Sequence, residues 1–446
     1  MNPGIFKAYD VRGVYPGELN EEIAYQIGRA AVAYLGVEQI AVGRDMRISG
    51  PEVAGGLMRG MAHQGADVIN LGLTSTDELY FAVGKFGYPA GVMVTASHNP
   101  AEYNGLKMCR AEAFPISDET GLLDMRDMIL QDRLPEPTRT GSITDRDVLA
   151  AYVEHCLSFI DRAALRPLKV VADAGNGMAG MTLPSVFAQL PCELIPLYFE
   201  LDGSFPNHEA NPIEPENIRD LQNKVRETGA DLGVAFDGDA DRMFLVDEHG
   251  TFVGGDMVTA MVAQRMLARY PGAAIVYNLI CSRSVPQTIQ AAGGRAIRER
   301  VGHSFIKATM RTEDAVFGGE HSGHFYFRDN WYADSGLIAF LTTLELLSAA
   351  NQSLSGVLKP LDPFVRSGEI NSEVADIKAV LARVEETHRA AGAQIDKLDG
   401  LTVEYPDWWF NLRASNTQPL LRLNVEASDD AQLKEKTAEV LQLVRS

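Results

Sequence analysis

Three aspartates at alternate positions, Asp237, Asp239 and Asp241, form the stretch of this chain with the clearest chemical meaning. They follow an apolar run, residues 232–236, that predicts a buried strand. Side chains at alternate positions of an extended or looped segment point to one side, so the carboxylates offer hard oxygen ligands for a divalent cation. Three protein ligands leave positions on Mg²⁺ open for a phosphate oxygen, as phosphoryl transfer requires.

The same aspartates also match part of a calcium-binding EF-hand loop. Together with Glu248 they stand at its positions 1, 3, 5 and 12. Position 6, which needs glycine for a sharp turn, is Arg242, and the flanking segments predict strands where an EF-hand has helices. The EF-hand interpretation is therefore disfavoured, and a solvated acidic turn is the other alternative without phosphoryl chemistry.

A second loop carries a candidate nucleophile. Residues 95–100, Thr-Ala-Ser-His-Asn-Pro, follow the apolar run 90–94, and Pro100 prevents the predicted strand from continuing. Ser97 therefore lies on a loop at the carboxyl end of a strand, where ligands bind in open α/β sheets. Its hydroxyl can act as a nucleophile or carry a phosphoryl group, whereas a simple Ser/Asn turn is the alternative.

The charge balance limits the partners. The formal net charge of -20 argues against non-specific nucleic-acid binding, so an anionic substrate must be captured by a local group of cations. Arg12 near the N-terminus, and Arg44 and Arg47 after another strand end, are candidates. Surface charge or a structural ion pair is the alternative for each of them.

Two further loops have residues suited to binding. Residues 319–324, Gly-Glu-His-Ser-Gly-His, and His303 with Ser304 can present hydrogen-bond partners to vicinal sugar hydroxyls, or can stabilise their own loops. Residues 413–417, Arg-Ala-Ser-Asn-Thr, place a guanidinium beside hydroxyl and amide donors, as in a phosphate cradle.

The elements that position these loops alternate between helix and strand in three successive segments of the chain. Asn20 and Ser49 are predicted N-caps, and Gly36 and Gly65 are predicted ends, of the first two helices. Further helices are expected near residues 183–190, 217–227 and 431–443, and further strands near 67–71, 168–172, 193–197, 274–277, 295–298, 315–318 and 420–426. Alternation of this kind is typical of mainly parallel sheets.

We therefore expect three similar mixed-sheet α/β domains and a smaller C-terminal α+β domain. The expected boundaries are 1–145, with a polar linker over 133–145, then 146–250, 251–362 and 363–446. Trp408, Trp409 and Phe410 are expected to pack the core of the last domain.

The bulk properties indicate a protein of the reducing cytoplasm. The four cysteines are scattered without Cys-x-x-Cys spacing, which suggests neither a disulfide framework nor a zinc site. The N-terminus lacks the apolar region of a signal peptide, and no apolar run approaches the roughly 18 residues of a membrane span. We expect neither export nor membrane insertion.

Taken together and in this order, the motifs T-A-S-H-N-P, D-G-D-A-D-R, G-E-H-S-G-H and R-A-S-N-T resemble those of the α-D-phosphohexomutase superfamily. The likeness runs from Tyr9 to Val425 and is strongest to the bacterial phosphomannomutase, or phosphomannomutase/phosphoglucomutase, branch. It implies four domains around a central cleft, a phosphorylated serine and an active-site Mg²⁺. It also implies glucose 1,6-bisphosphate, or mannose 1,6-bisphosphate, as activator, and hexose phosphates as substrates. The net charge and the lack of a long apolar run predict neither nucleic acid nor membrane as partner.

The resemblance assigns roles residue by residue. Ser97 is the expected phosphoserine and, with Asp237, Asp239 and Asp241, a metal ligand; Arg12, His98, Asn99, Lys107 and Arg242 surround the transferring group; Tyr9, His303, Glu320, Ser322 and His324 bind the sugar; Arg413, Ser415, Asn416 and Thr417 hold the phosphate that is not reacting. His98 or His303 is the candidate general base.

Some features stay open at this point. In some members of the superfamily a lysine reaches the substrate from the segment matching residues 279–283, where this chain has Ile280, and Arg283 is the possible substitute. Phosphoglucosamine mutases usually carry Gln where His321 stands, which favours mannose and glucose phosphates.

A metal-dependent sugar phosphatase and a non-catalytic binding module are the alternatives outside mutases. We expect a monomer or weak homodimer.

Overall fold

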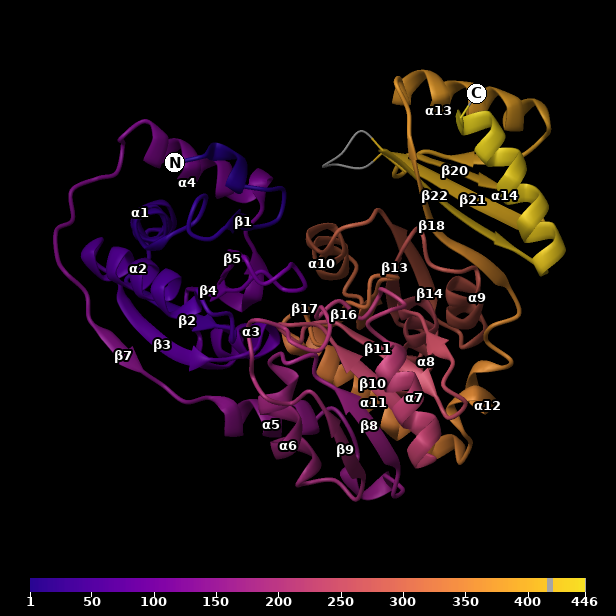
Figure 1. The fold of residues 1–446 in the computed structure, drawn as a ribbon, viewed down its shortest axis with the longest axis horizontal. Helices are drawn as coiled ribbons and strands as arrows, with labels where there is room; N and C mark the ends of the chain where they lie inside the picture. The colour runs from indigo at the N-terminus through magenta and orange to yellow at the C-terminus, as the bar shows by residue number, and fades with distance from the viewer. Residues whose placement is uncertain (415–419, 446) are drawn as a thin grey trace.

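The computed structural model describes residues 1–414 and 420–445. Within them the chain forms four sheets in sequence order, so that indigo, magenta, orange and yellow segments occupy successive regions of Figure 1. Three sheets are mixed and the fourth is antiparallel, which confirms the expected fold class. No helix among these residues is long and apolar enough to span a bilayer.

The first domain is built on a sheet of order β1-β5-β4-β2-β3-β7, with β6 paired to β5. Its strands are β1 (Val11–Val14), β2 (Gln39–Arg44), β3 (Asp67–Leu73), β4 (Ala90–Val94), β5 (Tyr103–Arg110), β6 (Phe114–Pro115) and β7 (Ile143–Asp145). Its helices are α1 (Glu21–Leu35), α2 (Gly50–His63), α3 (Thr76–Phe86) and α4 (Leu122–Leu130).

The second and third domains each carry a five-stranded sheet. The second contains β8 (Lys169–Asp173), β9 (Glu193–Leu197), β10 (Leu232–Phe236), β11 (Met243–Asp247), β12 (Phe252–Val253), α5 (Leu149–Leu157), α6 (Ala179–Phe187) and α7 (Arg219–Thr228). The third contains β13 (Ala274–Asn278), β14 (Arg295–Glu299), β15 (Phe317–Gly319), β16 (Phe325–Phe327), β17 (Ala333–Asp334), α8 (Gly255–Arg269), α9 (Ser284–Ala291), α10 (His303–Thr312), α11 (Gly336–Ala350) and α12 (Leu354–Leu358).

The fourth domain is an antiparallel sheet of order β18-β22-β21-β20-β19, with two helices beside it in Figure 1. Its elements are β18 (Val365–Glu373), β19 (Gln394–Asp396), β20 (Leu401–Glu404), β21 (Trp408–Ala414), β22 (Leu420–Ala427), α13 (Ile377–Ala390) and α14 (Asp430–Arg445). Trp408 and Phe410 lie in its core as predicted, while buried Trp409 donates its indole N–H to Glu426 at 2.8 Å.

The three α/β domains share one strand order, which explains how their loops converge. The orders β3-β2-β4-β5, β9-β8-β10-β11 and β14-β13-β15-β16 each contain three parallel strands followed by an antiparallel fourth. In every case one loop leaves the carboxyl end of the third parallel strand and leads into the antiparallel strand. We name these the serine loop (95–102), the acidic loop (237–242) and the glutamate loop (320–324). Three sequence motifs therefore occupy equivalent places in three similar sheets.

Local sequence signals account for the first helices. Asn20 accepts a hydrogen bond from the backbone N–H of Ile23, and Gly36 ends α1 with φ 64°, as predicted. Ser49 precedes α2, but its predicted capping bond is absent because its hydroxyl instead accepts from Asn104 Nδ2 at 2.9 Å. The predicted end of α2 at Gly65 is two residues late, since the helix ends at His63.

The predicted linker needs one correction. Its last residues, Ile143–Asp145, form β7, which pairs in parallel with β3 at the edge of the first sheet. All three residues are exposed, so no alternation of buried and exposed side chains marks the strand in the sequence.

The cores are divided unequally among the domains. The first and fourth domains have their own hydrophobic clusters, whereas one continuous cluster includes β8, β10, α8 and α11 and joins the second domain to the third. The four cysteines are free. The second and third domains therefore form a common base against which loops of the first domain can be held.

Candidate active site

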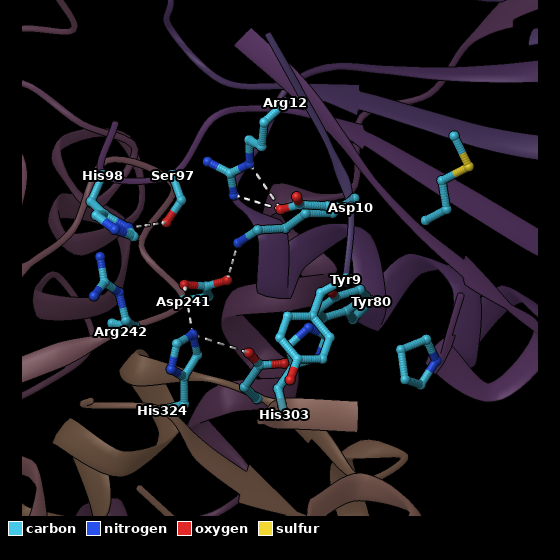
Figure 2. A pocket seen from close by; sticks show the side chains of 14 residues that line it. Tyr9, Asp10, Arg12, Tyr80, Ser97, His98, Asp241, Arg242, His303 and His324 are labelled. Atoms are coloured by element: carbon cyan, nitrogen blue, oxygen red, sulfur yellow. Dashed lines mark hydrogen bonds and ion pairs between the residues drawn. The ribbon is translucent and has the colours of Figure 1, made fainter. Parts of the chain in front are cut away.

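A cavity of about 150 Å³ lies where the first three domains meet. Side chains of the serine loop and the N-terminal segment face those of the acidic loop and third domain across it (Figure 2). The predicted site residues that line it are Tyr9, Arg12, Ser97, His98, Lys107, Asp241, Arg242, His303 and His324. Residues separated by more than 300 positions in the sequence thus meet at one place.

Ser97 has a strained backbone and a well-defined environment. It follows β4, is buried, and has φ 49°, a left-handed conformation that is uncommon for residues other than glycine. Its backbone N–H donates to Thr95 Oγ1 at 2.8 Å, and its hydroxyl donates to Asp237 Oδ2 at 2.7 Å. His98 Nδ1 lies 3.3 Å from the same hydroxyl. The candidate nucleophile is therefore held against the acidic loop of another domain.

Arg47 binds the backbone of the serine loop. The side chain is buried and donates to the carbonyl oxygens of Ser97 (2.9 Å), Asn99 (2.6 Å), Pro100 (2.8 Å) and Tyr103 (3.0 Å). Its Nε lies 3.3 Å from the Asp45 carboxylate. The structural ion pair considered for Arg47 is thus present, but the carbonyl contacts give this residue a further role in fixing the serine loop.

Arg12 also contacts the serine loop. Its guanidinium contacts the carbonyl oxygen of Ala96, donates to Asn99 Oδ1 at 2.8 Å, and pairs with Asp10 at 2.8 Å. This cation lines the cavity beside Ser97 (Figure 2). Asn99 therefore contributes mainly as a support for the loop.

The acidic loop approaches the serine loop closely at Gly238. A Cβ atom on this residue would lie 2.6 Å from the carbonyl oxygen of Ser97, closer than real Cβ atoms come to backbone atoms. Glycine is therefore required for the two loops to pack together. This contact brings Asp237 within hydrogen-bond distance of the Ser97 hydroxyl.

Cations of two domains surround the three aspartates. Lys107 Nζ lies 2.7 Å from Asp239 and 2.5 Å from Asp241, while Arg242 Nε lies 2.9 Å from Asp237. Thr76, which the sequence does not single out, donates its hydroxyl to Asp239 at 2.5 Å. Lys107 and Arg242 thus offset part of the negative charge of the three aspartates.

The aspartates fit a hard divalent cation. One ligand oxygen from each lies within 4.8 Å of the others. Among the described residues, Oδ1 of Asp239 is buried and has no hydrogen-bond partner. Buried carboxylate oxygens without partners are costly unless a cation is bound, so this donor set suits Mg²⁺.

The structure excludes the EF-hand alternative. The acidic loop joins β10 to β11, which pair antiparallel, so no helices flank it. Glu248, which would supply the last calcium ligand, instead accepts a hydrogen bond from Ser355 Oγ at 2.5 Å. Its carboxylate is therefore committed to a contact away from the aspartates.

Burial and neighbouring charges shift several pKa values here. Burial, reinforced by the Asp239 charge, raises the pKa of Asp241 to about 7. The positive charge of Arg242 and burial lower the pKa of His98 well below its usual value, and burial does the same for His303. Burial also lowers the pKa of His324 to about 4. These histidines are consequently neutral at neutral pH.

The glutamate loop contributes a preorganised carboxylate. Glu320 is buried, accepts a hydrogen bond from the Tyr326 hydroxyl, and lies 3.3 Å from Asn278 Nδ2. Ser322 Oγ lies 3.1 Å from His324 Nδ1. Glu320 and Ser322 are not among the described residues that line the cavity, so the structure places His324 in it but holds these two outside its wall.

The predicted phosphate cradle is described only at its first residue. Arg413 is the penultimate residue of β21 in the fourth domain, where its guanidinium lies 3.9 Å from Glu369. Ser415, Asn416 and Thr417 lie outside the described residues.

Arg283 does not reach the cavity. Its guanidinium donates to the carbonyl oxygens of Tyr405 (2.5 Å), Pro406 (3.2 Å) and Trp408 (3.1 Å) in the fourth domain. The residue considered as a substitute for the superfamily lysine therefore joins the third domain to the fourth.

Sequence reasoning missed several residues that shape the cavity. Asp10, Tyr80 and Asp334 line it, and buried Lys307 lies 2.6 Å from Asp334. For Asp334 a weak signal exists: an acidic residue follows an aromatic stretch and precedes Ser335, the N-cap of the apolar helix α11. Tyr80 lies within an apolar helical pattern that gives no indication of a site.

Comparison with protein families matches all four parts of the chain. Phosphoglucomutase/phosphomannomutase alpha/beta/alpha domain I matches residues 3–124, domain II residues 150–250 and domain III residues 254–364. The C-terminal domain of the same family matches residues 369–443.

Full-length relatives and a solved structure agree with these matches. A protein of Xanthomonas campestris pv. campestris named phosphohexose mutases is 43% identical over 442 residues, and an Escherichia coli phosphomannomutase is 42% identical over 450 residues. Each match covers 99% of both chains. A crystal structure of a Burkholderia thailandensis phosphoglucomutase/phosphomannomutase family protein superposes with a TM-score of 0.92 at 36% identity, covering 100% of this chain and 98% of the other.

Proposed function

Because the chain belongs to the phosphoglucomutase/phosphomannomutase family, we propose that it interconverts mannose 6-phosphate and mannose 1-phosphate, and also the corresponding glucose phosphates. The observation that carries this proposal is the Ser97 hydroxyl held 2.7 Å from Asp237, where the equivalent loops of two domains meet. A serine that carries a phosphoryl group at this position lies beside both a metal-binding loop and a cluster of cations.

In the proposed reaction, phosphoserine 97 transfers its phosphoryl group to O6 or O1 of a hexose monophosphate. The Ser97 O–P bond breaks as the new O–P bond forms, and the hydroxyl proton passes to a base. The resulting hexose 1,6-bisphosphate reorients within the cavity and transfers its other phosphoryl group to Ser97. Glucose 1,6-bisphosphate or mannose 1,6-bisphosphate activates the enzyme because either can phosphorylate Ser97.

Positioning and charge account for most of the catalysis that we propose. Arg12, Lys107 and Arg242 line the cavity beside Ser97 and would balance the charge on the transferring group. The oxygens of Asp237, Asp239 and Asp241, with one from phosphoserine 97, would hold Mg²⁺. When bound, Mg²⁺ would neutralise phosphate charge in the transition state.

The remaining residues are assigned to binding and proton transfer. We assign Glu320 and Ser322 to the sugar hydroxyls O3 and O4, with Tyr9, His303 and His324 around the ring. Arg413, Ser415, Asn416 and Thr417 would hold the phosphate that does not react. Neutral His98 adjoins the phosphorylated oxygen, and neutral His303 lies across the cavity, so both are candidates for the base.

A coupled assay tests the proposal. The protein is given mannose 1-phosphate, glucose 1-phosphate or glucosamine 1-phosphate, each with Mg²⁺ and a trace of glucose 1,6-bisphosphate. We expect conversion of the mannose and glucose compounds to their 6-phosphates. Conversion of glucosamine 1-phosphate alone would contradict the sugar assignment, and release of inorganic phosphate without isomerisation would show a phosphatase.

A further inference from the structure

The two carboxylate oxygens of Asp241 lie near different side chains. Oδ2 lies 2.5 Å from Lys107 Nζ, which also contacts Asp239. This oxygen is therefore part of the cluster that Lys107 forms with the aspartates of the acidic loop. Oδ1 faces the third domain, 3.8 Å from His324 Nε2, and has no hydrogen-bond partner among the described residues although it is buried. The second oxygen therefore lacks a partner of its own.

Three side chains converge on this place. Donor atoms of Asp241, His324 and Asp334 lie within 4.8 Å of one another, and Asp334 Oδ2 is 4.0 Å from His324 Nε2. In Figure 2 His324 lies beside Asp241, on the side of the cavity opposite Arg12. All three residues line the cavity, so an ion can reach them from it.

The supporting contacts orient these donors as in a metal site. Ser322 Oγ lies 3.1 Å from His324 Nδ1, which leaves Nε2 for the carboxylates. Buried Lys307, 2.6 Å from Asp334 Oδ1, holds that carboxylate in place. Partners of this kind fix the orientation of metal-ligating side chains and their loss weakens metal binding.

We propose that Asp241, His324 and Asp334 form a second cation site, which takes a borderline transition ion such as Zn²⁺ and shares Asp241 with the Mg²⁺ site. An imidazole nitrogen suits Zn²⁺, whereas Mg²⁺ prefers oxygen ligands and keeps its waters. One nitrogen and two carboxylates leave a fourth tetrahedral position open toward the cavity. The site links the second domain, through Asp241, to the third.

This second site goes beyond the mutase reaction, and its test does not depend on activity. Each site has a ligand that the other lacks: Asp239 would bind only Mg²⁺, and His324 would bind only the second cation. Full-length protein saturated with Mg²⁺ is titrated with Zn²⁺ against a chromophoric chelator, and Co²⁺ absorption reports a nitrogen-containing, tetrahedral environment. We expect wild-type protein to bind one further Zn²⁺ without releasing Mg²⁺.

Crossed variants give the decisive comparison. His324→Gln should retain Mg²⁺ and weaken the additional Zn²⁺ at least about tenfold, whereas Asp239→Asn should weaken Mg²⁺ and retain Zn²⁺. His321→Gln, on the same loop but outside the donor set, should bind both ions as the wild type does. The proposal is overturned if Zn²⁺ displaces Mg²⁺ one for one, or if His324→Gln binds Zn²⁺ as tightly as His321→Gln.

Asp334 provides an independent check within the same site. Asp334→Asn removes one oxygen donor but retains a side chain of the same shape beside Lys307, and thermal unfolding shows whether this variant is folded. A folded variant should lose Zn²⁺ affinity while its Mg²⁺ affinity is unchanged. Unchanged Zn²⁺ affinity would contradict the assignment of Asp334 as a ligand.

Discussion

The guanidinium of Arg47 donates a hydrogen bond to the carbonyl oxygen of Ser97 at 2.9 Å. The same side chain contacts three further carbonyl oxygens of the chain that follows, and Ser97 itself has a left-handed φ of 49°. Strained residues persist where the surrounding structure holds them in place. Arg47 therefore acts as a positioning residue for the candidate nucleophile.

Arg47→Lys should slow phosphoryl transfer because a lysine cannot reach all four carbonyl oxygens as a planar guanidinium does. We expect kcat to fall by about 100-fold, as for small misplacements of reacting groups, with KM much less affected. Steady-state kinetics measure the change. Arg44→Lys on the same segment is the matched control, because within the described part of the chain the Arg44 guanidinium donates only to the Asp45 carbonyl oxygen, at 3.3 Å. Equal activity of the two variants would contradict the positioning role.

Gly238→Ala should separate the acidic loop from the serine loop. The new Cβ would meet the Ser97 carbonyl oxygen at 2.6 Å, so one of the two loops has to shift. We expect kcat to fall by about 100-fold while the protein remains folded. Gly17→Ala serves as the control, because no atom of the described residues, apart from its chain neighbours, lies within 4 Å of its Cβ position. Wild-type kcat in Gly238→Ala would show that the close approach is dispensable.

Asp239→Ala should abolish the stabilisation that Mg²⁺ gives to the folded protein. A ligand at 100 times its Kd raises the free energy of unfolding by about 2.7 kcal/mol, so the effect is measurable as a shift in Tm. Glu248→Gln removes the carboxylate that would complete an EF-hand, and its response to Mg²⁺ should match the wild type. A normal Mg²⁺ shift in Asp239→Ala would remove this residue from the metal site.

Asp77 should make stability depend on pH. It is buried between domains, accepting hydrogen bonds from the hydroxyls of Tyr152 and, at 2.8 Å, Ser335, and burial raises its pKa to about 6. The folded state then holds this proton more tightly than the unfolded state. The resulting stabilisation is complete below the unfolded pKa, near 4, and is lost as pH rises through about 6.

The corresponding measurement compares the wild type with Asp77→Asn, whose side chain stays neutral. The difference in free energy of unfolding, wild type minus variant, should fall by about 3 kcal/mol as pH rises from below 4 to above 6. Thermal unfolding across this range reports it as a change in the Tm difference. Parallel pH profiles for the two proteins would contradict the shifted pKa.

Much of the site could be predicted because its chemistry is local. Ser97 and Asp237 each follow an apolar run that ends a strand, and the shared strand order of the domains brings these strand ends together. Arg47 was predicted only as a candidate for binding an anion. Its role in positioning the serine loop gave no signal, because its acceptors are backbone carbonyls about fifty residues later and every residue type has a carbonyl. Lys307 and Asp334 were missed because only the tertiary fold buries them together.

The weaker parts of the fold prediction have similar causes. The strand β18 (Val365–Glu373) is largely polar and mostly exposed or half-buried, and its register is interrupted after Arg366, so no regular alternation marks it. The edge strand β7 is exposed along its whole length. Strands near the middle of the α/β sheets, such as β4 and β10, are buried on both faces and were readily predicted.

The most direct test follows one phosphoryl group through a single turnover. Protein phosphorylated with glucose 1,6-bisphosphate is freed of excess activator and mixed with mannose 1-phosphate, and both the intact protein mass and the small-molecule products are measured. With an isotopic label on this phosphate, the account predicts that the label starts on Ser97, passes to O6 of the sugar and appears in mannose 6-phosphate, while the unlabelled phosphoryl group from O1 returns to Ser97. Appearance of the label as inorganic phosphate, or its retention in Ser97→Ala, would contradict a phosphoserine mutase.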